Sequence, residues 1–293
     1  PSRRIFGARA RGLTVTVNSM ADYTTCPAAL PRHGAGGTLL AMEHLLVVVK
    51  ALVVGTVAGF ASGLTGIGGG SIYVPVFFYF FDMPIKQAIG TSMLVMVLPA
   101  LTAFLTHLKG GQADFRLAAV MILSGVLATQ AGAQVTRHLP DLFVKAVFVM
   151  VIGGLSIPMF FKQEPAGDDG WTGCFPLWKA ILIGVSGGII AGMCGVGGAI
   201  LMLPLMHLFV CVPMRVCIGT VLSAVFFNAA SGMVSYLAAG LVDVRVGILV
   251  AVPAVLCAAL GARVSMRTNR VVLRKIFAVL LIIGALLVLV RPS

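Results

Sequence analysis

The chain has 293 residues, of which 59% are hydrophobic and 10% charged, and its formal net charge is +12. Soluble domains carry about 25% charged and roughly 45–50% apolar residues, so this composition excludes a water-soluble globule and indicates a polytopic protein of the lipid bilayer. The basic residues form no dense patch with interleaved aromatic side chains. Positive charge in short loops is typical of membrane topology, and no nucleic-acid partner is expected.

Residues 1–37 differ from the rest of the chain. They hold five arginines against a single acid, Asp22, and have no sustained periodicity. An arginine-rich, acid-poor segment is typical of a transit-type leader. The alternative is a mis-assigned start, with translation beginning at Met20 or Met42. We favour this alternative and expect residues 1–37 to be poorly ordered.

Apolar segments follow one another from Leu39 onward. A helix needs about 20 apolar residues to cross a bilayer, and the three longer segments after the first two meet this length. The arms Ala51–Leu64 and Ser71–Phe81 flank a glycine run, and each is expected to reach only part-way across. A polar linker at 162–176 separates the halves. The predicted segments are Leu39–Leu64, Ser71–Phe81, Ala88–Leu108, Phe115–Thr136, Leu142–Phe161, Leu177–Met193, Ile200–Val210, Cys217–Leu237, Val244–Val264 and Val272–Val290.

The glycine run occurs twice, at 63–70 and at 192–199, with a constant offset of 129 residues that pairs Gly66 with Gly195. The match continues without a gap over more than a hundred residues and pairs Thr91 with Thr220. This pattern indicates an internal duplication. We predict an all-α polytopic membrane protein with two homologous repeats, 38–161 and 177–293. Each repeat has about four spans, giving about eight transmembrane helices, and each contains a glycine-broken helix.

The relative direction of the repeats depends on the glycine elements. If each element crosses the membrane once, the halves are parallel; if each returns to the side it entered, they are inverted. The loops at Arg137–Lys145 and Arg263–Lys275 are both rich in lysine and arginine, so both are expected in the cytoplasm. This favours parallel halves, although inverted repeats are common in transporters.

The two glycine breaks are the first candidates for a site. Irregular backbone in a membrane survives only where it is buried or lines a wet cavity. A helix that begins after a break points free N–H groups into the interior and attracts anions. We therefore expect the breaks to face each other and to form the substrate site, with close packing as the alternative. Packing is assigned to the upstream stripes, Gly55, Gly59 and Gly63 with Gly184, Gly188 and Gly192. Substrate lining is assigned to Gly66, Gly68, Gly69, Gly70, Gly195, Gly197 and Gly198.

Neutral polar side chains near the breaks are further candidates, namely Thr91, Ser92, Thr220 and Asn228. Hydroxyls and amides suit oxyanion oxygens, although Ser and Thr in a span often bond their own helix backbone. His207 is a candidate proton carrier or an interfacial residue. The sequence has no recognisable catalytic or nucleotide-binding motif and no CxxC pair. We expect no enzymatic activity, no cofactor and no metal site.

These residues resemble the TauE/SafE family of sulfite and organosulfonate exporters, in the toluene-sulfonate uptake permease superfamily. The resemblance rests on the residues 59–70, Pro75 and Ile89-Gly90-Thr91-Ser92, with the repeats at 188–198 and 218–220; Ala199 departs from it, since Gly70 stands in the first copy. The resemblance implies a multi-pass transporter of the bacterial inner membrane.

The expected function is therefore secondary transport of a small anion, a sulfite or organosulfonate, by alternating access of two repeats. The alternative is a channel or a membrane-embedded scaffold without carrier activity. The sequence does not indicate the anion, the direction, the coupling ion or the oligomeric state.

Overall fold

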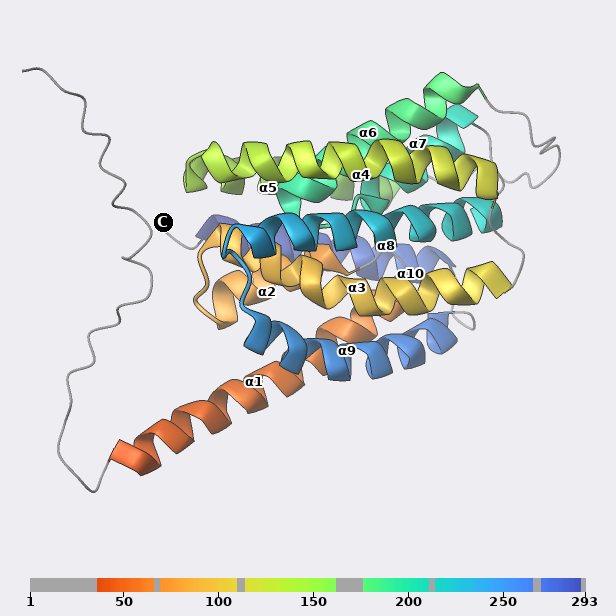
Figure 1. The fold of residues 1–293 in the computed structure, drawn as a ribbon. Coiled ribbons are helices and arrows are strands. Elements are labelled where there is room, and N and C mark those ends of the chain that lie inside the picture. Colours follow the sequence, from red (N-terminus) through yellow and green to blue (C-terminus); the bar gives the residue numbers. More distant parts are fainter. Residues whose placement is uncertain are drawn as a thin grey trace, which may run out of the picture. The chain divides into compact units, whose positions relative to one another are not determined.

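The computed structural model describes residues 36–65, 69–109, 114–161, 176–210, 214–265 and 270–290 (Figure 1). These residues form ten helices and no strand. Contacts are described within the unit Leu45–Ser293, which is separate from Pro1–His44. The expectations for residues 1–35 and for the linker at 162–175 lie outside the described residues. The helices are α1 (Gly36–Thr65), α2 (Gly70–Phe80), α3 (Ile85–Lys109), α4 (Phe115–His138), α5 (Asp141–Phe161), α6 (Leu177–Cys194), α7 (Ala199–Val210), α8 (Met214–Ala238), α9 (Val244–Ser265) and α10 (Arg270–Val290).

Each predicted apolar segment corresponds to one helix, with ends that agree within three residues. The prediction that the arm before the first break is too short to span was wrong. Helix α1 has 30 residues, because Lys50 lies inside it without ending it; a lysine stem packs along apolar surface. The arm after the break, α2, has 11 residues and is short as predicted.

Six helices in the described part of the chain contain an apolar window long enough to cross a bilayer. They confirm a helical, multi-pass membrane protein, whereas the total of about eight spans stays a prediction. The windows are Leu45–Gly63, Ile85–Thr102, Phe115–His138, Leu177–Cys194, Val216–Ala238 and Val244–Gly261.

Helices α3 and α8 correspond to each other in the predicted duplication, and they pack antiparallel. Near the start of α3, Thr91 Oγ1 accepts the N–H of Asp243, just beyond the end of α8 (3.0 Å). Near the start of α8, Thr220 Oγ1 accepts the N–H of Asp114, just beyond the end of α3 (3.3 Å). The expectation of parallel halves is therefore wrong for this pair, since the equivalent helices run in opposite directions.

The directions of the helices also determine at which end of the bundle each basic loop lies. Helix α4 is parallel to α8, because Gly125 faces Asn228 and, further along both helices, Arg137 Nη2 donates to Ser235 Oγ (2.8 Å). Helix α9 is parallel to α3, because Gly247 faces Thr91 and Leu94, and Val252 lines a cavity with Leu98. Consequently α4 and α9 are antiparallel, and their ends at Arg137 and Arg263 lie at opposite ends of the helix bundle. The two basic loops cannot both be cytoplasmic, as the charge pattern had suggested.

The upstream glycine stripes join the two halves. A Cβ on Gly188 of α6 would lie 2.9 Å from Ala128 Cβ of α4, and one on Gly59 of α1 would lie 2.5 Å from Ala254 Cα of α9. Each stripe thus lets its helix approach the backbone of a helix from the other half. The prediction that these glycines serve packing is confirmed.

We expect Gly188→Ala to lower stability by about 1–3 kcal/mol, because its Cβ meets the Gly125 carbonyl and backbone atoms cannot move aside. The matched control is Gly154→Ala in α5, where a Cβ meets nothing within 4 Å. There the better helix propensity of alanine leaves stability unchanged or raises it by up to about 1 kcal/mol. Thermal unfolding of the detergent-solubilised variants measures the difference, and equal melting temperatures would contradict the packing assignment.

Candidate functional site

In the described residues, each break contains glycine in a left-handed conformation. Gly69 has φ 69° as the N-cap of α2, and Gly195 has φ 69° as the C-cap of α6, where its N–H donates to Ala191 O. Gly197 and Gly198 follow with φ 73° and 84°. Residues with a Cβ rarely adopt these angles, which explains why the sequence places several glycines here. Gly66 and Gly68 lie outside the described residues.

The two breaks meet, as the sequence predicts. A Cβ on Gly70 would collide with the carbonyl oxygen of Gly195 and would lie 2.8 Å from Val196 Cα. The Sδ of Met96 lies against Gly70, and its methyl group is 2.6 Å from the position of a Gly197 Cβ. The first turn of α2 and the loop before α7 therefore enclose one buried methionine from α3.

Ser92 and Val225 complete this contact. The hydroxyl oxygen of Ser92 lies 2.7 Å from Ile89 O and 3.1 Å from Gly195 O, and its single proton is donated to one of them at a time. Val225 of α8 approaches the position of a Gly197 Cβ to 2.9 Å. Met96 and Val225 occupy corresponding positions of the duplication, so apolar side chains from both halves close the centre.

Thr91 and Thr220 lie in equivalent contacts between the halves. Their hydroxyls accept the backbone N–H groups of Asp243 and Asp114. The side chain of Asp114 in turn accepts the N–H groups of Arg116 and Leu117 at the start of α4. These threonines therefore hold helix starts, and a contact with substrate stays a prediction for both.

Asn228 lies in the middle of α8 with no exposed surface. Neither Nδ2 nor Oδ1 has a hydrogen-bond partner, and the same holds for Oγ1 of Thr129, which is also fully buried. A Cβ on Gly125 would lie 2.7 Å from Asn228 Oδ1, and one on Gly232 would lie 3.3 Å from Thr129 Cγ2. The two polar side chains thus lie one helical turn apart across the α4–α8 interface.

Our reading of the sequence missed Thr129. In the other repeat Ala258 corresponds to Thr129, and Pro99 corresponds to Asn228. The sequence did offer a signal for Thr129, because a polar residue in one repeat corresponds to an apolar residue in the other. Symmetric packing of the two repeats does not require such a difference.

Comparison with known proteins identifies the family. The family model described as sulfite exporter TauE/SafE matches residues 51–288. The chain belongs to the TauE/SafE sulfite exporter family. It is 27% identical to the probable membrane transporter protein YunE of Bacillus subtilis over 225 residues, covering 69% of this chain and 81% of that protein.

Other relatives extend over more of the chain. A probable membrane transporter protein of Methanocaldococcus jannaschii is 24% identical over 260 residues, covering 82% of this chain and 96% of that protein. YdhB of Bacillus subtilis, also named a probable membrane transporter protein, is 24% identical over 254 residues, covering 83% and 99%. No solved structure matches the chain. This TauE/SafE member is accordingly a membrane transporter by family.

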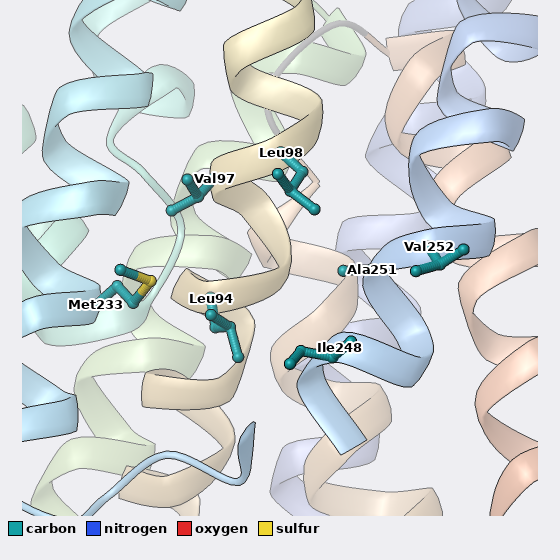
Figure 2. A pocket seen from close by; sticks show the side chains of 7 residues that line it. All are labelled: Leu94, Val97, Leu98, Met233, Ile248, Ala251 and Val252. Atoms are coloured by element: carbon teal, nitrogen blue, oxygen red, sulfur yellow. The ribbon is translucent and has the colours of Figure 1, made fainter. Parts of the chain in front are cut away.

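A cavity of about 170 Å³ lies elsewhere in this TauE/SafE protein, between α3, α8 and α9 (Figure 2). Every side chain that lines it is apolar, so it offers no group that selects an anion. Leu98, Ile248 and Val252 are among its more exposed residues, and in a bilayer such a surface suits lipid chains. The lining residues are Leu94, Val97, Leu98, Met233, Ile248, Ala251 and Val252.

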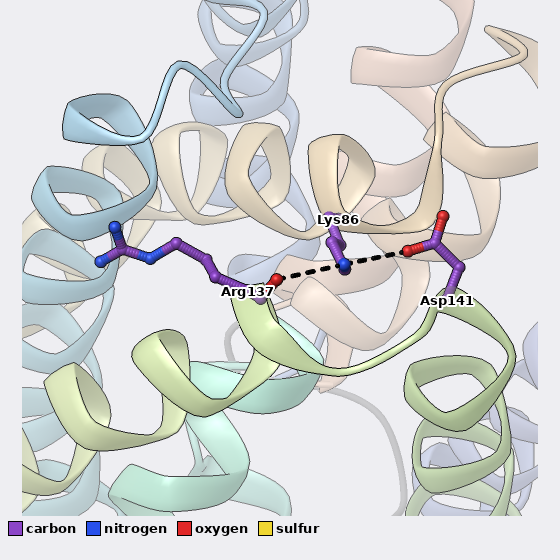
Figure 3. A network of polar contacts seen from close by, with 3 residues as sticks. All are labelled: Lys86, Arg137 and Asp141. Carbon is purple, nitrogen blue, oxygen red and sulfur yellow. Dashed lines mark hydrogen bonds and ion pairs between the residues drawn. The ribbon is translucent and has the colours of Figure 1, made fainter. Parts of the chain in front are cut away.

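Charged contacts lie at helix ends. Lys86 at the start of α3 pairs with Asp141 at the start of α5 (3.2 Å) and donates to Arg137 O at the end of α4 (3.3 Å), as Figure 3 shows. The side chain of Asp141 is 49% exposed, so the pair contributes at most about 1 kcal/mol. Among the described residues no group of three His, Cys, Asp or Glu side chains suits a metal ion. The side chain of His207 is outside the described set.

Proposed function

We propose that this protein is a secondary transporter of small anions, with sulfite or an organosulfonate as substrate, in the inner membrane. The observation that carries the proposal is the contact of Gly70 with Gly195 and Val196. It brings two irregular backbone segments from corresponding positions together inside a bundle of membrane helices. Membership in the TauE/SafE family supports transport of this kind.

The proposed site uses backbone N–H groups. Helices α2 and α7 begin at Gly70 and Ala199. The third N–H group of each helix, at Ile72 and Leu201, donates back to Gly69 O (2.9 Å) and Gly198 O (3.2 Å), so the proposed donors are the first two N–H groups of each helix. The positive ends of the two helix dipoles favour an anion between them. Of the sequence candidates, Ser92 contacts the second break. The proposed substrate-binding set remains Gly66, Gly68, Gly69, Gly70, Gly195, Gly197, Gly198, Thr91, Ser92, Thr220 and Asn228, with His207 as a candidate proton carrier.

The proposed mechanism is alternating access by two inverted repeats, 38–161 and 177–293. The antiparallel packing of α3 and α8 supports inversion, because repeats related by an axis in the membrane plane place equivalent helices in opposite directions. The contacts Thr91–Asp243 and Thr220–Asp114 lie at opposite ends of α3. In this arrangement each end of the site opens when one of these contacts separates.

Uptake into proteoliposomes tests the proposal. We expect labelled sulfite, or one member of a panel of small sulfonates, to enter and to exchange against unlabelled substrate in counterflow. A channel passes substrate without counterflow, and a scaffold passes none. Gly197→Leu is expected to lower flux at least tenfold, because its side chain collides with Met96 and Val225, whereas Gly154→Leu retains wild-type flux. Normal transport by Gly197→Leu would exclude the break as the site.

A further inference from the structure

Two buried polar side chains in the bundle have unmet hydrogen-bonding capacity. Asn228 is the fifteenth residue of α8 and Thr129 the fifteenth of α4, so both lie near mid-helix. Their three polar side-chain atoms have no partner, and both side chains are fully buried. An unpaired buried polar group destabilises the folded state, and such groups in native proteins call for an explanation. A bound ligand that pairs with them is one.

The pair adjoins the second glycine break. Val225, one turn before Asn228 on α8, contacts Gly197. On the other side, a Cβ on Gly192 in the last turn of α6 would collide with the carbonyl oxygen of Thr129. Asn228 and Thr129 therefore extend the proposed substrate site from the break into the α4–α8 interface.

The chemistry of the pair selects among ligands. Asn228 offers two N–H donors and one carbonyl acceptor, and Thr129 offers one donor and an acceptor. A fully ionised oxyanion has only acceptors, so it pairs with the donors and repels Oδ1. A metal cation pairs with the oxygens and repels the amide N–H groups. An oxyanion that carries one hydroxyl pairs with both, whichever way the amide is turned.

In the described part of the chain, the charged and titratable groups on the helices around the pair have partners, lie near helix ends or are buried thiols, including Cys217 in the first turn of α8. Tyr236 of α8 donates its hydroxyl to Gly192 O (2.7 Å), and Arg137 of α4 donates to Ser235. Cys194 of α6 is buried. Lys86 of α3 is paired with Asp141 at the helix start. Lys179, Asp114, Arg116 and His138 lie in the terminal turns of α6 and α4 or beside them.

We propose that Asn228 and Thr129 bind the singly protonated form of the oxyanion, so that the substrate itself carries the transported proton. The proposal rests on the transport function proposed above. On the entry side a doubly charged anion takes up one proton, and the resulting monoanion binds. On the exit side the monoanion leaves and releases that proton, so one proton moves with each anion. Because Pro99 and Ala258 replace the pair in the other repeat, each chain holds one such site.

The test compares sulfite, which titrates between a monoanion and a dianion near neutral pH, with methanesulfonate, which carries no titratable proton. Labelled uptake and internal acidification are recorded together in proteoliposomes over a range of pH. We expect sulfite uptake to rise as pH falls, in proportion to the hydrogen sulfite fraction, with one proton per sulfite. Methanesulfonate uptake, where present, is expected to bring no protons.

Substitutions of the two side chains test whether they bind the protonated anion. Thr129→Val and Asn228→Leu are expected to lower sulfite uptake at least tenfold and to abolish thermal stabilisation by hydrogen sulfite. The control Ser124→Ala, whose hydroxyl bonds Val120 O within α4 (2.8 Å), is expected to behave as wild type. Thr129→Val keeps the side-chain shape, so it tests the pair even if Asn228→Leu fails to fold.

Two outcomes are distinguishable. Sulfite uptake without proton entry, or a wild-type pH profile in Thr129→Val, overturns this proposal and leaves the transport function standing. Absence of flux for every anion in the panel overturns the transport function and this proposal with it.

Discussion

Gly70→Ala and Gly195→Ala are expected to abolish transport, whereas Gly240→Ala is expected to retain most of it. A Cβ at residue 70 meets the Gly195 carbonyl and the sulfur of Met96, and a Cβ at residue 195 lies 2.7 Å from Ser92 Oγ. Overpacking of this kind costs about 1–3 kcal/mol. Here it also separates the two breaks, so the loss of flux is expected to exceed the loss of stability.

The three variants separate backbone strain from crowding. Gly195 and Gly240 share φ 69°, where a residue with a Cβ is strained by about 1–2 kcal/mol. A Cβ at Gly240 meets nothing within 4 Å, whereas Gly70 has no such φ and is limited by crowding alone. Flux in proteoliposomes and melting temperature in detergent are measured for each variant. If Gly195→Ala matched Gly240→Ala in both, contact between the breaks would not be required for transport.

The helices themselves were readable from the sequence because membrane helices are long apolar runs with polar interruptions. The boundaries of α4 and α9 follow from Asp114 and Asp243, which precede an apolar run and accept first-turn N–H groups. The meeting of the breaks agrees with the expectation that irregular backbone inside a bilayer is buried or lines a wet cavity, which placed both breaks in the interior of the bundle.

The direction of the halves was not readable from the charges. Helices α4 and α9 both end with basic residues, at Arg137 and Arg263. The rule that positive loops are cytoplasmic therefore assigned both helix ends to the same side of the membrane, whereas the packing places them at opposite ends of the bundle. What decides the direction is pairing between distant helices, such as the donation from Asp243 to Thr91. The packing of Thr129 beside Gly232 also depends on distant helices, although the contrast with Ala258 in the other repeat was a signal in the sequence.

The packing of the halves also limits how such a transporter can move. Helix α1 packs on α9 through Gly59, and α6 packs on α4 through Gly188. Each half therefore has one helix packed closely against a helix of the other half. These close contacts involve backbone atoms and resist separation. The hydrogen bonds of Thr91 and Thr220 join single atoms at the helix starts. They are therefore contacts that can separate without displacing packed backbones, as are the donations from Arg137 to Ser235 and from Gln130 to Ser231.

Thr91→Val and Thr220→Val are consequently expected to bias the transporter toward opposite sides of the membrane. Valine keeps the shape of threonine but removes the acceptor, so the closed form loses one part-buried hydrogen bond to the N–H of Asp243 or Asp114, worth about 1 kcal/mol. Opening lets water pair with that N–H. Since 1.4 kcal/mol corresponds to a tenfold shift in an equilibrium, the outward-to-inward ratio is expected to change about fivefold.

A cysteine at Val225, beside Gly197 at the centre, reports the opening in a background without native cysteines. A membrane-impermeant thiol reagent is applied from one side or the other. Thr91→Val is expected to raise labelling from one side and Thr220→Val from the opposite side, because the two hydrogen bonds lie at opposite ends of α3. The control Thr56→Val, whose hydroxyl bonds Leu52 O in its own helix (2.7 Å), leaves both rates unchanged. Increased labelling from the same side in both variants would contradict inverted repeats. Unchanged labelling in both variants would show that the two threonines have a structural role and do not control opening.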